Sequence, residues 1–267
     1  MPAMARIRHD VAVATSSPLG QTRCGNTVFR WGERTYVMGI INVTPDSFSG
    51  DGLGLNLEAT LSLAKRMVEE GADIIDIGGE STRPQADALS AEEELGRVIP
   101  AVMKLASLPV PLSVDTYKPE VARRALDAGA CMINDVWGLQ KDSGLARLAA
   151  EKKAPIIITS NQRDRPATEI VSEVLGDLKR SIETALEAGV PRENIIVDPG
   201  FGFGKTLEQN LELLRRMEEI KALGRPVLAG TSRKSMIGQV LDLPPDQRLE
   251  GTAATVAISN ANGADIV

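Results

Sequence analysis

The feature that most constrains this chain is an alternation of short apolar segments with segments of helical periodicity. The apolar segments lack the alternation of a half-exposed strand, which indicates strands buried on both faces of a parallel sheet. Eight such segments alternating with helices favour a (β/α)8 TIM barrel over a doubly wound sheet. They span residues 37–43, 73–78, 111–116, 131–136, 154–159, 194–199, 226–231 and 264–267.

The intervening segments carry the amphipathic spacing of helices that cover such a sheet. Residues 57–68 repeat apolar side chains at helical intervals, and the pattern stops at Gly71. A later helix is predicted to open at a capping box formed by Thr206 and Gln209 and to end at Gly224.

The sequence before the first strand suggests an N-terminal hairpin. Residues 27–37 are expected to turn near Gly32 and to cover the bottom of the barrel. We expect residues 1–26 to be a flexible leader without a signal peptide, and residues 27–267 to form one barrel domain. The eighth apolar segment ends at Val267, so we expect a chain truncated after strand eight, with the last helix missing.

Composition excludes several kinds of partner. The net charge is −6 and the basic residues are scattered, so nucleic acid is not expected as a partner. No apolar run is long enough to cross a membrane. Cys24 and Cys131 are the only cysteines and form no disulfide framework, which fits a cytoplasmic protein.

The histidine content excludes several kinds of catalysis. His9 is the only histidine, and it lies in the predicted leader. A Ser-His-Asp triad, a Cys-His pair and a His-ligated zinc site are therefore not expected.

Polar residues stand at the end of almost every predicted strand. Catalytic groups of a barrel project from the carboxyl ends of its strands, so these residues should share one mouth. A single Asp or Asn there is more often a helix cap, but the recurrence favours a site rich in hydrogen-bond acceptors. Such a site suits a nitrogen-rich heterocycle or a hydrated metal ion. The residues are Asn42, Asp76, Asp115, Asn134, Asp135, Thr159, Asp198, Ser232 and Lys234.

Basic residues are fewer and lie in two of the loops. Arg83 follows the second strand and Lys234 follows the seventh, where both are candidates to bind an anionic or carbonyl-bearing substrate. The glycine-rich stretch 198–206 matches neither a Walker A motif nor a dinucleotide-binding motif.

Several ordered motifs resemble those of the dihydropteroate synthases, the pterin-binding barrels of folate synthesis. The resemblance covers the chain from about Thr27 to its end. It rests on "MGIINVTPDSFSGDG", "GADIIDIGGESTRP", "SVDTYKPEVARRALDAGACMINDV", "VDPGFGFGKTLEQN" and "GTSRKSMIG". It implies condensation of 6-hydroxymethyl-7,8-dihydropterin pyrophosphate with p-aminobenzoate, giving 7,8-dihydropteroate and pyrophosphate.

The resemblance also implies roles for particular residues. The pterin would be held by Asp115, Asn134, Asp198 and Lys234. Asn42 would help to bind Mg²⁺ and pyrophosphate, and with Asp115 and Lys234 it would serve catalysis. The p-aminobenzoate pocket, where sulfonamides compete, would comprise Phe48, Thr82, Arg83, Pro84, Phe203 and Ser232. The family further implies a homodimer.

Two departures from the family pattern and three alternatives accompany this interpretation. The family usually continues beyond the last strand with an Arg-x-His element, and its fifth strand usually ends in Met-His where this chain has Thr159-Ser160. A pterin-binding paralogue without activity, a pterin-dependent methyltransferase and a class I aldolase using Lys234 remain the alternatives.

Overall fold

The computed structural model describes residues 19–44, 56–81, 88–164 and 167–267. Its strands are β1 (Gln21–Cys24), β2 (Thr27–Arg30), β3 (Met38–Asn42), β4 (Ile74–Gly78), β5 (Leu112–Asp115), β6 (Met132–Asp135), β7 (Ile156–Thr159) and β8 (Ile195–Asp198). Its helices are α1 (Leu57–Glu69), α2 (Ala91–Leu105), α3 (Pro119–Ala128), α4 (Gly144–Lys152), α5 (Ile170–Glu187), α6 (Leu207–Arg215), α7 (Glu218–Lys221), α8 (Ser235–Leu241) and α9 (Leu249–Ala261). Single 3-10 turns occupy Arg192–Asn194 and Pro245–Gln247.

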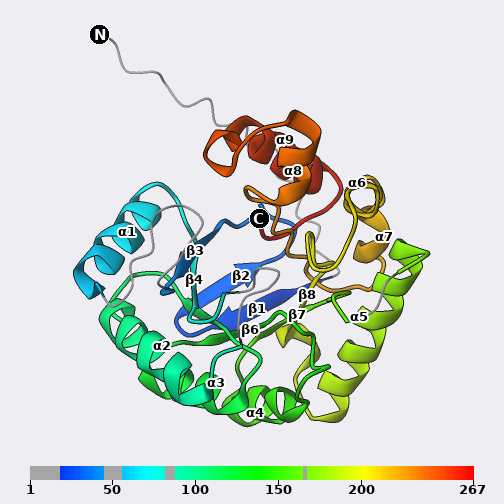
Figure 1. Ribbon diagram of the computed structural model, residues 1–267. Coiled ribbons are helices and arrows are strands. Elements are labelled where there is room, and N and C mark those ends of the chain that lie inside the picture. Colours follow the sequence, from blue (N-terminus) through cyan, green and yellow to red (C-terminus); the bar gives the residue numbers. More distant parts are fainter. Residues whose placement is uncertain (1–18, 45–55, 82–87, 165–166) are drawn as a thin grey trace.

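The central sheet contains six parallel strands in sequence order, β3 to β8, and helices surround it (Figure 1). In the described ranges, the two remaining predicted strands pair through isolated bridges, from Val197 to Val227, from Leu228 to Ile266 and from Ile266 back to Tyr36. These bridges close the sheet into a ring. The prediction of an α/β fold is confirmed. Of the eight predicted strands of the barrel, six form a regular parallel sheet and two form isolated bridges. Pro226, the first residue of the seventh segment, has no N–H to donate, but its carbonyl accepts from Val197 N at 2.9 Å.

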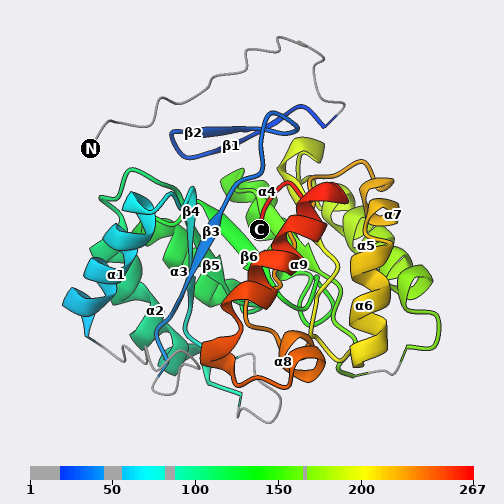
Figure 2. The same cartoon turned by 90° about the horizontal axis from the view of Figure 1, so that it is seen from above.

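The N-terminal hairpin lies earlier in the chain than predicted. β1 and β2 pair antiparallel, with Cys24 opposite Thr27, so the turn falls at Gly25 and Asn26 and not near Gly32. Gly25 has a φ of +57°, a conformation that favours glycine and fixes the turn there. β1 thus begins inside the segment 1–26 that was predicted as a leader. Figure 2 shows the hairpin lying across one end of the barrel.

The hairpin closes that end with a cluster of aromatic side chains. Trp31 stacks on Phe29 at a centroid distance of 5.5 Å, and Tyr36 meets both rings edge-on. Trp31 Nε1 donates to Thr22 Oγ1 at 2.9 Å, so its one polar atom is satisfied. These rings pack on apolar side chains from the strands. We call the group the base cluster: Cys24, Phe29, Trp31, Tyr36, Ile74, Met132, Ile157, Ile196, Leu228 and Ile266.

The helices bury their apolar faces against the outside of the sheet in two further clusters. The predicted capping box of Thr206 and Gln209 is confirmed, with Gln209 N donating to Thr206 Oγ1 at 3.2 Å. The helix that it opens ends at Arg215 rather than near Gly224, and the short α7 follows after a break. None of the helices in the described ranges is long and apolar enough to span a bilayer.

Candidate active site

The register of the parallel strands brings the predicted polar residues to one level. Asn42 pairs with Gly78, Gly78 with Asp115, and Asp115 with Asn134 across four neighbouring strands. Further around the sheet, Thr159 pairs with Asp198. A methyl group placed on Gly78 would lie 3.4 Å from Asp115 Oδ2 and 3.5 Å from Asn42 Oδ1. The two side chains therefore flank the bare backbone of Gly78 at the barrel mouth.

Asn134 is held in one orientation by Asp76. Its Nδ2 donates to Asp76 Oδ2 at 3.0 Å, and both side chains are buried. Within the described part of the chain, Asn134 Oδ1 is buried without a hydrogen-bond partner. Because a buried acceptor without a partner is costly, Asn134 presents an acceptor that a ligand N–H could satisfy.

Asp115 is surrounded by other carboxylates. Burial raises the pKa of Asp115 well above its usual range, and neighbouring carboxylates, Asp76 foremost, raise it further. The positive charge of Lys234 acts in the opposite direction and lowers this pKa. A cation or N–H donors beside Asp115 would therefore stabilise the charged form of its carboxylate.

Lys234, Asp198 and Phe203 form the opposite side of the mouth. Burial lowers the pKa of Lys234, and Asp198 opposes this shift. Burial also raises the pKa of Asp198 to about 6, although Gly200 N donates to its Oδ1 at 2.7 Å. Lys234 Nζ lies 4.6 Å from the centroid of the Phe203 ring, a distance at which a cation–π contact is favourable.

Two basic residues that the sequence analysis missed lie beside this group. Arg163 Cζ is 4.7 Å from the centroid of the Phe203 ring, and Asp115 influences its pKa. Lys205 Nζ donates to Ser160 O at 2.9 Å and to Gly200 O at 2.8 Å. Both follow strands in irregular segments, where neither periodicity nor the quoted motifs distinguish a basic side chain of the mouth from one in solvent.

The end of β7 has its own buried hydrogen-bond network. Ser160 Oγ donates to Asp177 Oδ2 at 3.1 Å, and Gln162 Nε2 donates to the same oxygen at 2.6 Å. Ser160, which stands where the family pattern usually has histidine, is therefore hydrogen-bonded to helix α5. Thr159 Oγ1 is buried and, in the described ranges, has no hydrogen-bond partner.

Not every predicted polar residue faces the mouth. Asp135 Oδ1 accepts from Trp137 N at 2.9 Å and its Oδ2 accepts from Leu139 N at 2.6 Å, which makes it the anchor of the turn after β6. Ser232 is exposed in the turn between Thr231 and Lys234. Four predicted residues lie outside the described residues: Phe48, Thr82, Arg83 and Pro84.

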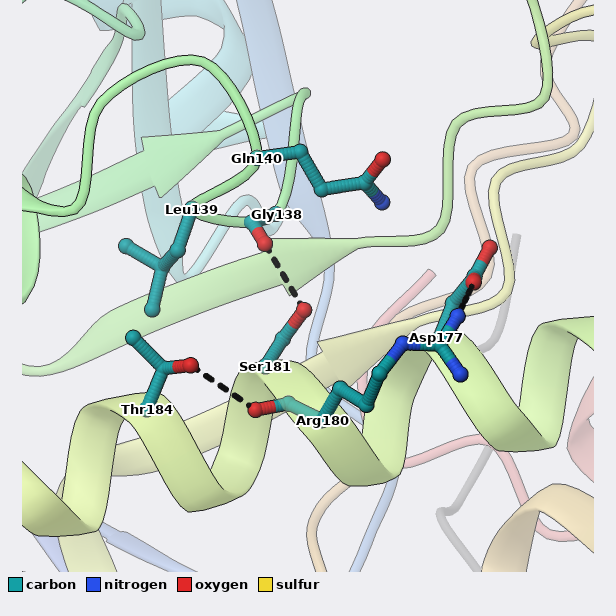
Figure 3. Close-up of a pocket in the computed structure, with 7 residues that line it drawn as sticks. All are labelled: Gly138, Leu139, Gln140, Asp177, Arg180, Ser181 and Thr184. Atoms are coloured by element: carbon teal, nitrogen blue, oxygen red, sulfur yellow. Dashed lines mark hydrogen bonds and ion pairs between the residues drawn. The ribbon is translucent and has the colours of Figure 1, made fainter. Parts of the chain in front are cut away.

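A cavity of about 160 Å³ lies on the outer side of the loop after β6, against helix α5 (Figure 3). Ser181 Oγ donates to Gly138 O at 2.7 Å, and Thr184 Oγ1 donates to Arg180 O at 3.0 Å. None of the candidate site residues in the described ranges lines this cavity, which is a crevice between paired structural groups.

Fold and mouth together define the class: a barrel enzyme that gathers carboxylates, an amide and lysine at the carboxyl ends of its strands. Oxygen ligands suit Mg²⁺, but in the described ranges no three His, Cys, Asp or Glu side chains gather to hold a metal ion. Among the residues that the structure describes, Asn42 could contribute to such a site, together with oxygens of a bound substrate.

Comparisons with known proteins identify the family. A family model described as pterin binding enzyme matches residues 38–267. The dihydropteroate synthase of Bacillus subtilis is 51% identical over 236 residues, 88% of this chain and 83% of that protein.

Solved structures agree with this result. A Xanthomonas albilineans dihydropteroate synthase with 4-aminobenzoic acid has a TM-score of 0.87 and 43% identity, covering 94% of this chain and 92% of that chain. The Yersinia pestis enzyme in a sulfonamide complex has a TM-score of 0.87 and 40% identity, covering 92% of both chains. The chain therefore belongs to the pterin-binding enzymes and, within them, to the dihydropteroate synthases, which are transferases of folate biosynthesis and sulfonamide targets.

Proposed function

We propose that this chain condenses 6-hydroxymethyl-7,8-dihydropterin pyrophosphate with p-aminobenzoate, releasing pyrophosphate and forming 7,8-dihydropteroate. The observation that carries the proposal is the gathering of Asp115, Asn134, Asp198 and Lys234 at one barrel mouth. The similarity to solved synthases, one of them with 4-aminobenzoic acid, supports the same reaction.

The pterin is recognised by complementary hydrogen bonds. Its ring and amino N–H groups donate to Asp115, to Asp198 and to the unsatisfied Oδ1 of Asn134. Lys234 donates to the oxo side of the ring and balances the two carboxylates. N–H donors favour the charged form of a carboxylate. Ligand binding therefore counteracts the rise in the pKa of Asp115 and Asp198 that burial causes.

The reaction requires separation of a leaving group more than it requires a base. The arylamine is a neutral nucleophile, so no histidine is needed to activate it. The carboxylate of Asp115 offsets the positive charge that develops at the pterin methylene as pyrophosphate leaves. Lys234 and Arg163 add positive charge at the same mouth.

Mg²⁺ fits the residues at the mouth. Asn42 Oδ1 is a hard oxygen donor beside the bare backbone of Gly78, and Mg²⁺ commonly takes only one or two protein ligands in addition to substrate phosphates and water. When bound, the ion would supply charge neutralisation to the leaving pyrophosphate.

The second substrate binds beside the Phe203 ring. Phe203 exposes 7% of its surface, and Lys234 and Arg163 both contact its ring. We assign p-aminobenzoate, and sulfonamides in competition with it, to Phe203 and Ser232 together with Phe48, Thr82, Arg83 and Pro84.

We further propose a homodimer that uses helices α8 and α9. Leu249 and Val240 expose 65% and 55% of their surfaces, and Leu241 and Ile258 are also exposed. Such apolar exposure on adjacent helices supports burial against a second copy. We propose that the barrel domain of residues 27–267 also includes strand β1, because β1 pairs with β2.

A pyrophosphate-release assay tests the proposed reaction. With both substrates and Mg²⁺ we expect release that depends on p-aminobenzoate, is abolished by chelation and is restored by added Mg²⁺. Calorimetric binding of the pterin substrate without any release would instead favour the non-catalytic paralogue. Binding of methyltetrahydrofolate in place of p-aminobenzoate would favour the methyltransferase.

The Schiff-base aldolase needs a lysine with a lowered pKa, and Lys234 has one. Burial accounts for that shift, and family membership assigns the chain elsewhere. Borohydride with a carbonyl substrate should therefore leave Lys234 unmodified.

A further inference from the structure

The only two cysteines of the chain, 107 positions apart, meet at the base of the barrel. Cys24 closes the hairpin strand β1, and Cys131 stands directly before β6. Their Sγ atoms are 2.9 Å apart, and Cys24 Sγ also lies 3.4 Å from Cys131 O. Both are free thiols. Neither residue has a part in the site at the opposite end of the barrel.

The two thiols differ in accessibility and acidity. Cys24 is fully buried in the base cluster, whereas Cys131 is partly exposed. The hydrogen bond between them, followed by burial, raises the pKa of Cys24. The same hydrogen bond lowers the pKa of Cys131. Since the thiolate is the reactive form, Cys131 is the thiol that reacts first with an external reagent.

The turn of the hairpin lies directly beside the sulfur of Cys131. Gly25 lies over Cys131, and a methyl group placed on Gly25 would come within 3.5 Å of its sulfur. With glycine there, the backbone between Cys24 and Asn26 does not cover Cys131 with a side chain.

We propose that Cys24 and Cys131 form a reversible disulfide that joins the N-terminal hairpin to the base of the barrel in response to peroxide. The Cys131 thiolate attacks one oxygen of hydrogen peroxide, the O–O bond breaks, and hydroxide leaves while Cys131 becomes a sulfenic acid. The Cys24 sulfur then attacks the sulfur of Cys131. The S–O bond breaks, and the thiol proton of Cys24 leaves with the hydroxyl group as water. The hydroxide takes up the proton that Cys131 released on ionisation, so two thiols and one peroxide give one disulfide and two waters.

The disulfide would act on stability and not on the chemistry at the mouth. It would close a loop of more than 100 residues in the unfolded chain, which restricts the unfolded ensemble strongly. It would also fix β1 to the start of β6, so that the base cluster could not open by detachment of the hairpin. The dithiol form leaves that attachment to noncovalent contacts.

The experiment treats the purified wild-type chain with hydrogen peroxide and analyses its peptides by mass spectrometry without reduction. We expect one cross-linked peptide pair containing Cys24 and Cys131, and its loss after dithiothreitol. The Tm of the oxidised protein should rise by about 5 °C or more and return to its starting value on reduction. The kcat/KM of pyrophosphate release should stay unchanged.

Two matched variants separate the steps. In Cys24→Ser, Cys131 should stop at the sulfenic acid, which dimedone traps. In Cys131→Ser, the buried Cys24 should react much more slowly than Cys131 does in the first variant. Circular dichroism establishes whether each variant is folded, and the wild-type experiment stands without them.

The proposal is overturned if folded wild-type protein yields no cross-linked pair, or if both cysteines oxidise independently to sulfinic acids. It is equally overturned if the cross-link forms but leaves the Tm unchanged or lowers it, because the disulfide then does not stabilise the attachment of the hairpin to the barrel. None of these outcomes bears on the proposed transferase reaction, which is measured separately.

Discussion

The two ends of this barrel are built by opposite rules. At the base, aromatic rings fill the interior and the indole N–H of Trp31 has a partner. At the mouth, carboxylates crowd together, the pKa of Asp115 and Asp198 is raised, and Asn134 Oδ1 has no partner in the described ranges. The base is arranged for stability, whereas the mouth carries unfavourable features that a substrate can relieve. Substitutions at the two ends should therefore have different effects.

The largest effect is expected at the base. Trp31→Ala removes a ring with 1% exposure from the base cluster and should lower the free energy of unfolding by about 3–5 kcal/mol. The kcat of the remaining folded protein should be unchanged. Urea denaturation measures the first quantity and pyrophosphate release the second. Trp31→Phe is the matched control, since it keeps a ring in place. A loss of kcat with normal stability would contradict the division between the two ends.

A smaller effect on stability is expected from the buried carboxyl group of Asp198, which makes the folded protein less stable as the pH rises. Its pKa of about 6 in the folded state exceeds the ordinary value of 3.8, so the folded protein binds the proton more readily than the unfolded chain. Stability should therefore fall as the pH rises from about 4 to 6, by on the order of 2 kcal/mol. Asp198→Asn should flatten this part of the pH–stability curve while it reduces activity. An unchanged slope in the variant would show that other groups, such as Asp135, account for it.

Substitutions in the pterin site should affect activity more than stability. Asp115→Asn and Lys234→Ala should each reduce kcat/KM at least tenfold, about 1.4 kcal/mol of transition-state stabilisation. Lys234→Arg serves as the control that keeps the charge and changes the shape. Near-normal rates in both primary variants would remove these residues from the proposed mechanism.

The smallest effect is expected at a polar group that lies in a helix cap and not in the proposed site. Thr206→Ala removes the N-cap of α6 and should lower the free energy of unfolding by about 1 kcal/mol. KM for both substrates should remain unchanged. Thermal denaturation together with steady-state kinetics tests this, and Thr206→Ser, which keeps the hydroxyl, should behave as wild type. A raised KM would place this cap in the substrate site.

The strands and their polar ends could be predicted because they depend on local pattern. Buried parallel strands are continuously apolar, so the change to Asp or Asn at residues such as Asp115 and Asp198 marks where each strand ends. The position of the hairpin turn could not be predicted in the same way. Gly25 and Gly32 both have positive φ, and only the pairing of Cys24 with Thr27 identifies the one that joins two strands.

The residues missed at the mouth illustrate a second limit. Lys205 and Arg163 belong to segments without regular periodicity, and they meet the other site residues only through the closed shape of the sheet. The opposite happened with Asp135. The sequence pattern grouped it with the strand-end residues of the mouth, whereas its carboxylate accepts hydrogen bonds from the backbone of the turn after β6. Which way a strand-end carboxylate points is decided by loop geometry, which sequence pattern does not specify.

The hydrogen bonds of the Lys205 ammonium group connect the movements of two loops. The ammonium group bridges the backbone oxygens of Ser160 and Gly200, and Gln162 N donates to Phe203 O at 3.1 Å, so two loops from neighbouring strands are fastened together. Displacement of the first loop should then shift the backbone of Phe203 in the second. Replacements around Ser160 should consequently alter affinity for aryl compounds that they never touch. Since burial lowers the pKa of Lys205 to about 7, mild alkali should loosen this fastening.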